Sequence, residues 1–243
     1  MLKTISFLRI TILWICIHYY FLWLNEILKN ADSFAYIQMA KALANFDISW
    51  FGTWWFGFIY SLPIALASFY TNDLFFAAWI INLVFFALWW YFLYKISEKY
   101  LRWFFLFIPL ILYYTSSTLI GFNIQVLSEN IYIPLFLGLI YILQNFSINS
   151  WRKTIWISII MALLYLTRAE AFIYLWSLFL IFFYIWFTWV WFKKASKYFW
   201  TIIVLFFVLI SPYLWYLHSI TWEWWLTNKW SSNLRQASMR GLE

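Results

Sequence analysis

Seven long apolar runs constrain this chain more than any other feature of its sequence. About twenty apolar residues suffice for a helix to cross the hydrocarbon core of a bilayer, and a helix satisfies its own backbone hydrogen bonds there. We therefore expect an all-α polytopic membrane protein with about seven transmembrane helices. The runs at 131–146 and 154–168 are short for a span, which implies tilt or partial burial within a bundle. The runs occupy roughly residues 5–24, 74–94, 103–120, 131–146, 154–168, 170–191 and 198–217.

The composition excludes a water-soluble domain with a single core. Hydrophobic residues make up 66% of the chain and charged residues 10%, whereas soluble domains are about 45–50% apolar and about 25% charged. Cys16, the single cysteine, lies inside the first run, which excludes a disulfide framework and a cysteine metal cluster. No small-residue cleavage site follows this run, so we interpret it as an uncleaved span rather than a signal peptide.

The distribution of charge predicts an orientation in the plasma membrane. With the N-terminus inside, eight of the nine acidic residues lie on the outer face, and only Glu98 lies inside. The opposite topology would place three basic clusters outside, against the positive-inside rule. The net charge of +7 is thereby explained without nucleic acid as a partner. The inner face receives ten basic residues: Lys3, Arg9, Lys95, Lys99, Arg102, Arg152, Lys153, Lys193, Lys194 and Lys197.

The predicted organisation is a seven-span membrane module over 1–217, followed at 218–243 by the start of a further outer loop. The first outer loop, 25–73, is long and rich in aromatic residues, and we expect surface helices in it. One is amphipathic, begins near Asp32 and lies along the membrane surface, and a second starts near Pro63. In the first, apolar and polar residues interleave: Phe34, Ile37 and Leu43 with Gln38, Lys41 and Asn45.

Acidic residues at the edges of spans are functional candidates, because charge is costly there. Asp32, with Tyr36 one turn later, is either a general base toward a hydroxyl or a helix cap without a catalytic role. Glu129 lies in the turn Leu127-Ser128-Glu129-Asn130 between the third and fourth runs. It either meets a cation, a metal or a hydroxyl, or it caps the fourth helix.

Basic residues on the same face are candidates for phosphate and metal binding. Arg168, in Thr167-Arg168-Ala169-Glu170, either grips a phosphate or pairs with Glu170 or Glu129. His218 ends the seventh run, and with Asp32 and Glu129 it would offer nitrogen and oxygen ligands to a divalent cation. The sequence has no local metal motif, glycine-rich phosphate loop or nucleophile elbow.

Four short motifs, in order along nearly the whole chain, resemble the GT-C superfamily of membrane glycosyltransferases. In pattern they are similar to bacterial members related to protein mannosyltransferases and lipid A aminoarabinose transferases. The resemblance implies that the chain corresponds to the N-terminal conserved seven-span module of such an enzyme. The motifs are Asp32-x-x-x-Tyr36-x-x-x-Ala40, Leu127-Ser128-Glu129, Leu166-Thr167-Arg168-Ala169-Glu170, and Ser211-Pro212-Tyr213 leading to His218.

The resemblance also implies an activity. Such enzymes move a sugar, with inversion, from a polyprenyl-phosphate donor to a hydroxyl of a glycan, lipid or protein acceptor on the outer membrane face. Asp32 would be the catalytic base, Glu129 would orient the acceptor or a divalent metal ion, and Arg168 would hold the lipid phosphate. The remaining expected substrate-binding residues are Tyr36, Lys41, Glu170, His218 and Lys229.

Two other classes of membrane protein stay open at this point. A transporter subunit needs ionisable residues that line a path in mid-membrane, or broken helices in matched halves. The runs here carry almost no such residues beyond His18 and Asn82. A scaffold without catalytic activity is favoured if Asp32, Glu129 and Arg168 lie far apart.

Tryptophan is unusually frequent in this chain and glycine is unusually rare. There are 21 Trp and 5 Gly, although glycine is more frequent in membrane helices than in soluble ones. We hypothesise that many of these Trp stand where the source organism reads the codon UGA as glycine, since the family segments around positions 222 and 230 carry glycine. An AT-rich genome would deplete glycine but would not raise tryptophan. UGG codons at Trp222 and Trp230 would contradict this hypothesis.

Overall fold

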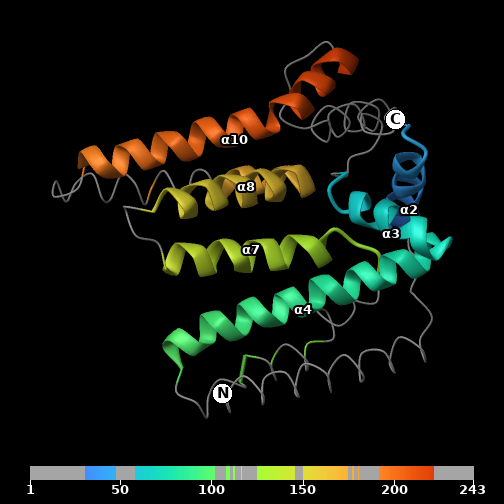
Figure 1. Cartoon of the computed structure of the whole chain (residues 1–243), viewed down its shortest axis with the longest axis horizontal. Coiled ribbons are helices and arrows are strands. Elements are labelled where there is room, and N and C mark those ends of the chain that lie inside the picture. The colour runs from blue at the N-terminus through green and yellow to red at the C-terminus, as the bar shows by residue number, and fades with distance from the viewer. Residues whose placement is uncertain are drawn as a thin grey trace, which may run out of the picture. The chain divides into compact units, whose positions relative to one another are not determined.

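The computed structural model describes residues 31–47, 58–101, 125–145, 150–174 and 192–221, with isolated positions at 108, 109, 112, 116, 177 and 180 (Figure 1). These residues form six α-helices and one short 3-10 helix, and no β-strand occurs among them. The expected all-α class is thereby confirmed. The chain divides into two units, Met1–Asp47 with Tyr60–Tyr141 and Ile48–Ile59 with Ile142–Glu243, and each is described by itself below.

Two helices in the described part are long and apolar enough to cross a membrane. They are α4 (Leu74–Tyr100) and the Ser196–Ser219 portion of α10 (Phe192–Thr221). At about 1.5 Å per residue, α4 with its 27 residues exceeds the roughly 30 Å of a hydrocarbon core. Helices α7 (Glu129–Gln144) and α8 (Trp151–Thr167) have 16 and 17 residues and are shorter than a typical span.

The described residues thus contain two helices of spanning length, not the seven expected over the whole chain. The runs predicted at 131–146 and 154–168 do form helices, namely α7 and α8. The run at 5–24 lies outside the described residues, and those at 103–120 and 170–191 lie mainly outside them.

The predicted outer loop contains the two expected helices, α2 (Ala31–Ala44) and α3 (Ser61–Thr71). Pro63 is in the first turn of α3, where its missing N–H costs nothing because first-turn N–H groups have no acceptor within the helix. The C-cap residue of α3, Asn72, adopts the left-handed conformation with φ 54°, which asparagine tolerates better than most residues.

The predicted apolar face of α2 is wrong in part. The helix packs against α3 and α4 and buries Ile37, but Phe34 is 49% exposed and shares a stripe with the exposed Gln38 and Lys41. The buried side combines the large side chains of Tyr36, Ile37 and Met39 with small ones. These buried small residues are Ser33, Ala35, Ala40 and Ala42.

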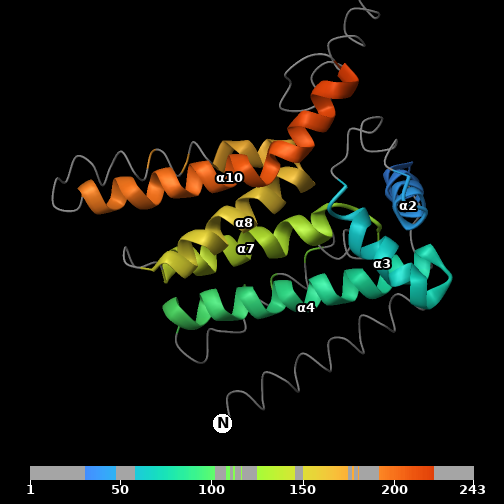
Figure 2. The same cartoon turned by 45° about the horizontal axis from the view of Figure 1, so that its top comes forward.

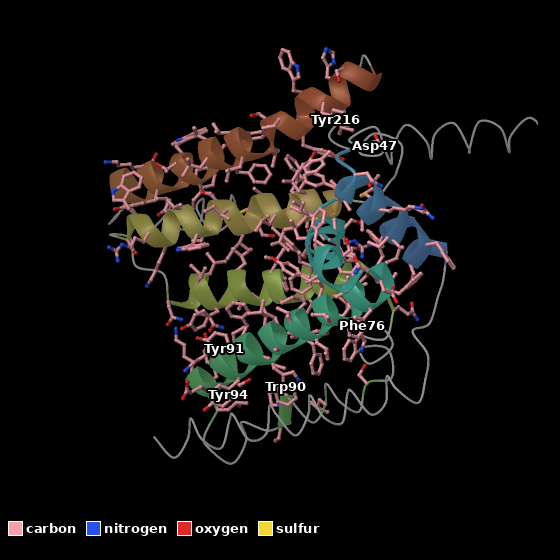
Figure 3. All side chains as sticks on the ribbon, turned by 45° about the vertical axis from the view of Figure 1, so that its right-hand side comes forward. Asp47, Phe76, Trp90, Tyr91, Tyr94 and Tyr216 are labelled. Atoms are coloured by element: carbon pink, nitrogen blue, oxygen red, sulfur yellow. The ribbon has the colours of Figure 1, made fainter. Side chains whose placement is uncertain are left out.

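Helix α4 begins at a well-formed cap. The carboxylate of Asp73 accepts hydrogen bonds from the backbone N–H groups of Phe75 at 2.8 Å and Phe76 at 3.3 Å. The helix continues six residues beyond the predicted end at 94, and Lys95 pairs with Glu98 at 3.0 Å in these added turns. Aromatic residues occur along its length, from Phe76 near its start to Tyr91 and Tyr94 near its end (Figure 3).

In the second unit α8 packs along α10, and the short 3-10 helix η3 (Ala169–Phe172) follows α8. Ring contacts join the two long helices: the centroids of Trp151 and Tyr198 are 5.2 Å apart, and those of Tyr165 and Phe206 are 5.8 Å apart. Both views show α8 and α10 beginning at the same end (Figures 1 and 2).

Helix α10 contains a proline that its neighbour compensates. Pro212 cannot donate to the carbonyl of Val208, four residues earlier. The hydroxyl of Ser211 donates to that carbonyl instead, at 2.8 Å. Figure 2 shows α10 bending toward its C-terminal end, and an interior proline is a common cause of such a bend.

Candidate functional site

Asp32, the expected base, lies in the first turn of α2 with an exposed side chain. A carboxylate is stabilised there because the helix dipole is positive at the N-terminus. Lys41 is exposed in the last turn. Nine residues separate the two, which at 3.6 residues per turn puts them about half a turn apart on opposite sides of the helix. Lys41 therefore does not share a helix face with Asp32.

Tyr36, one turn after Asp32, belongs to the core. Its side chain is 2% exposed, and its ring meets that of Tyr60 edge to face at a centroid distance of 5.1 Å. The hydroxyl of Ser61 donates to the backbone carbonyl of Tyr36 at 3.0 Å. Tyr36 thus anchors the helix that carries Asp32, and its role in substrate binding stays a prediction.

A buried set of hydrogen bonds surrounds Tyr60. Its hydroxyl donates to Asn82 Oδ1 at 2.6 Å, and Asn82 Nδ2 donates to the carbonyl of Gln125 at 3.0 Å. Asn130 Nδ2 donates to the same carbonyl at 2.8 Å, so both lone pairs of that oxygen are used. We call Tyr36, Tyr60, Asn82 and Asn130, with the Gln125 carbonyl, the Tyr60 network.

The electrostatics of the Tyr60 network keep its phenol neutral. Burial raises the pKa of the Tyr60 hydroxyl well above its usual range, and hydrogen bonds with Asn130 and Asn82 only partly offset that effect. A neutral phenol can donate a hydrogen bond, as the contact with Asn82 requires. The hydroxyl therefore remains a donor at all ordinary pH values.

Glu129, the second acidic candidate, is the first residue of α7 and is half-buried. The hydroxyl of Ser128 donates to Glu129 Oε2 at 3.4 Å, and the carbonyl of Ser128 accepts from the N–H of Tyr132 at 2.9 Å. Its neighbour Asn130 belongs to the Tyr60 network. The turn that carries Glu129 is thereby linked to the helix that carries Asp32 within one unit.

Arg168 lies at a break in the second unit, as the interrupted apolar runs predicted. It ends α8 in an extended conformation, with φ −147° and ψ 121°, and its N–H donates to the carbonyl of Leu164 at 2.9 Å. Its side chain is half-buried. Glu170 follows in η3, and the half-buried His218 lies near the end of α10.

The predicted site residues divide between the two units. Asp32, Tyr36, Lys41 and Glu129 belong to the first, and Arg168, Glu170 and His218 to the second. Lys229 lies outside the described residues. Over the ranges that the structure describes, no three His, Cys, Asp or Glu side chains gather as a metal site would require.

Sequence reasoning missed Tyr60 and Asn130 as residues that support the site. The available signal was an amide in an apolar setting: Asn82 within the second run, and Asn130 next to Glu129.

No protein-family model, characterised protein or solved structure matches this chain. The residues of the two units therefore carry the functional conclusion by themselves.

Proposed function

We propose that this chain is a GT-C-type membrane glycosyltransferase. It transfers a sugar, with inversion, from a polyprenyl-phosphate donor to an acceptor hydroxyl on the outer face of the plasma membrane. Its N-terminus lies inside, and its seven spans place the loop 25–73 outside. The supporting observation is that the two acidic motifs resembling this family, at Asp32 and Glu129, meet one buried framework, the Tyr60 network.

The chemistry assigned to Asp32 fits its place in the fold. The exposed carboxylate takes the proton of the acceptor hydroxyl while that oxygen attacks the anomeric carbon. The bond between the anomeric carbon and the phosphate oxygen breaks, and its electron pair leaves with the polyprenyl phosphate. Because a phosphate is a good leaving group, the reaction needs cations near it more than a second acid.

The remaining expected residues then have defined tasks. Arg168, half-buried at the end of α8, supplies a guanidinium for the phosphate as its charge develops, and Lys229 assists it. Glu129 orients the acceptor hydroxyl or holds a divalent metal ion. Glu170 and His218 are assigned to substrate binding as well.

Transfer assays on the purified full chain test this proposal. A panel of labelled polyprenyl-phosphate sugars is offered with glycan, lipid and peptide acceptors, and initial rates are compared for wild type, Asp32→Asn and Asp47→Asn. Asp47 is an exposed acid in the same loop and serves as the matched control. Loss of a general base lowers a rate by roughly 10²–10⁴-fold, so Asp32→Asn should lose nearly all transfer, whereas Asp47→Asn stays within about twofold.

Two results would contradict the proposal at different levels. Equal rates for wild type and Asp32→Asn would remove Asp32 as the base. Absence of transfer by wild type from every donor in the panel would overturn the glycosyltransferase itself.

A further inference from the structure

The second unit gathers positive charge where α8 and α10 begin. Arg152 and Lys153 lie in the first turn of α8, and Lys193, Lys194 and Lys197 lie in the first two turns of α10. The two helix starts are neighbours, because the rings of Trp151 and Tyr198 lie 5.2 Å apart. We call these five basic residues the α8/α10 basic patch.

Within the second unit, no acidic residue lies close in sequence to the patch, so none is available there to balance its charge. No Asp or Glu occurs from 142 to 169 or from 171 to 222. The corresponding end of α4 differs, since Lys95 is paired there with Glu98 at 3.0 Å. The sequence assigns the end of α4 and the starts of α8 and α10 to the same membrane face. Positive charge is partly balanced by an acidic residue at the end of α4 but not at the starts of α8 and α10.

Aromatic side chains hold part of the patch in place. The ammonium of Lys197 lies over the ring of Trp151, 5.1 Å from its centroid, within the range of a cation–π contact. The ammonium of Lys153 donates to the carbonyl of Asn145. Arg152 and Lys197 are exposed, as is Trp200 one turn further along α10. Charge and aromatic rings therefore share one surface.

The position of the patch relative to a spanning segment identifies its partner. The part of α10 that is long and apolar enough to cross a membrane, Ser196–Ser219, begins within the patch. In the proposed topology, on which this inference rests, the patch therefore lies at a membrane boundary. Tryptophan and tyrosine are enriched at this depth, and basic clusters beside a spanning helix attract anionic lipid headgroups. We propose that the α8/α10 basic patch binds the headgroup phosphates of anionic phospholipids in the adjoining leaflet.

Native mass spectrometry of the full chain in detergent tests this binding, with phosphatidylglycerol and phosphatidylcholine of identical acyl chains as probes. Each basic residue near an anionic membrane surface contributes roughly a fivefold gain in affinity for anionic over neutral lipid. Wild type should bind phosphatidylglycerol far more than phosphatidylcholine. A variant in which all five basic residues of the patch are changed to Gln should bind the two lipids about equally.

The matched control is the double variant Lys95→Gln/Glu98→Gln at the end of α4, which removes one charge of each sign from the Lys95–Glu98 pair and should keep the wild-type preference within about twofold. If the variant with all five substitutions does not fold, two variants with fewer substitutions replace it: Arg152→Gln/Lys153→Gln and Lys193→Gln/Lys194→Gln/Lys197→Gln. Each should reduce the preference for phosphatidylglycerol. A salt titration of wild type needs no variant, and the preference should fall steeply between about 0.05 and 0.5 M salt as screening increases. Equal binding of both lipids by wild type would overturn the proposal. So would a variant with all five substitutions that keeps the same lipid preference as the control.

Discussion

At the scale of single residues, Tyr60 connects the two acidic motifs. Its ring packs on Tyr36, its hydroxyl bonds to Asn82, and Asn82 shares the Gln125 carbonyl with Asn130. A buried polar group that loses its partner costs roughly 1–3 kcal/mol, so each member of the network depends on the others. Asp32 and Glu129 are thereby carried by elements whose relative position is fixed.

Alkaline pH should weaken this network. The folded protein holds the Tyr60 proton more tightly than the unfolded chain, because burial raises the folded pKa above the ordinary value of 10.0. The resulting stabilisation is therefore fully present below pH 10 and is lost as the pH rises further. We expect the melting temperature in detergent to fall less steeply above pH 10 in Tyr60→Phe than in wild type.

Tyr70 provides the control for that measurement, since it lies in α3 with a side chain that is 92% exposed. Tyr70→Phe should follow wild type across the alkaline range. If Tyr60→Phe and wild type lose stability in parallel above pH 10, the phenol does not make this contribution.

At the scale of elements, the start of α4 rests on a single carboxylate. Asp73 accepts from two backbone N–H groups that have no partner within the helix. Asp73→Ala should lower the free energy of unfolding by about 1 kcal/mol, whereas Asp73→Asn should cost much less, because asparagine caps helices equally well. Thermal unfolding of both variants checks this. An Asn variant as damaged as the Ala variant would show that charge, not capping, stabilises this helix end.

The proline in α10 predicts a coupling between two neighbouring residues. Ser211→Ala removes the hydroxyl that serves the Val208 carbonyl and should cost about 1 kcal/mol. In a Pro212→Ala background the restored N–H of residue 212 donates a hydrogen bond to the same carbonyl. The loss of unfolding free energy caused by Ser211→Ala should then nearly vanish. A double-mutant cycle by thermal unfolding measures this coupling. Equal costs in both backgrounds would contradict it.

At the scale of the whole molecule, the apolar runs predicted the long helices but not their ends. Helix α4 extends to Tyr100 through the Lys95–Glu98 pair, and α10 starts at Phe192, since lysine favours helices and its long stem covers apolar surface. The exposure of Phe34 was mispredicted because the side of α2 that packs on α3 and α4 is formed by Tyr36, Ile37 and Met39 together with small residues. Hydropathy alone does not carry that information.

The candidate residues could be selected from the sequence only where the signal is local. Asp32, Glu129 and Arg168 lie at helix ends, where spacing and charge indicate them. The Tyr60 network escaped prediction because its hydrogen bonds join residues 22 and 43 positions apart. Such pairings arise from tertiary packing and leave only a weak local signal, an amide in an apolar setting.

Sugar transfer in sealed vesicles of known orientation tests the proposed activity and the proposed topology together. The orientation is scored by an impermeant maleimide on Asn45→Cys in a Cys16→Ser background, since Cys16 is the single native cysteine. A short-chain polyprenyl-phosphate sugar and a soluble acceptor are then added outside. We predict transfer only where the loop 25–73 faces the added donor, loss of that transfer in Asp32→Asn, and its retention in Asp47→Asn. Transfer in the opposite orientation alone, or an Asp32→Asn rate equal to wild type, would contradict this account.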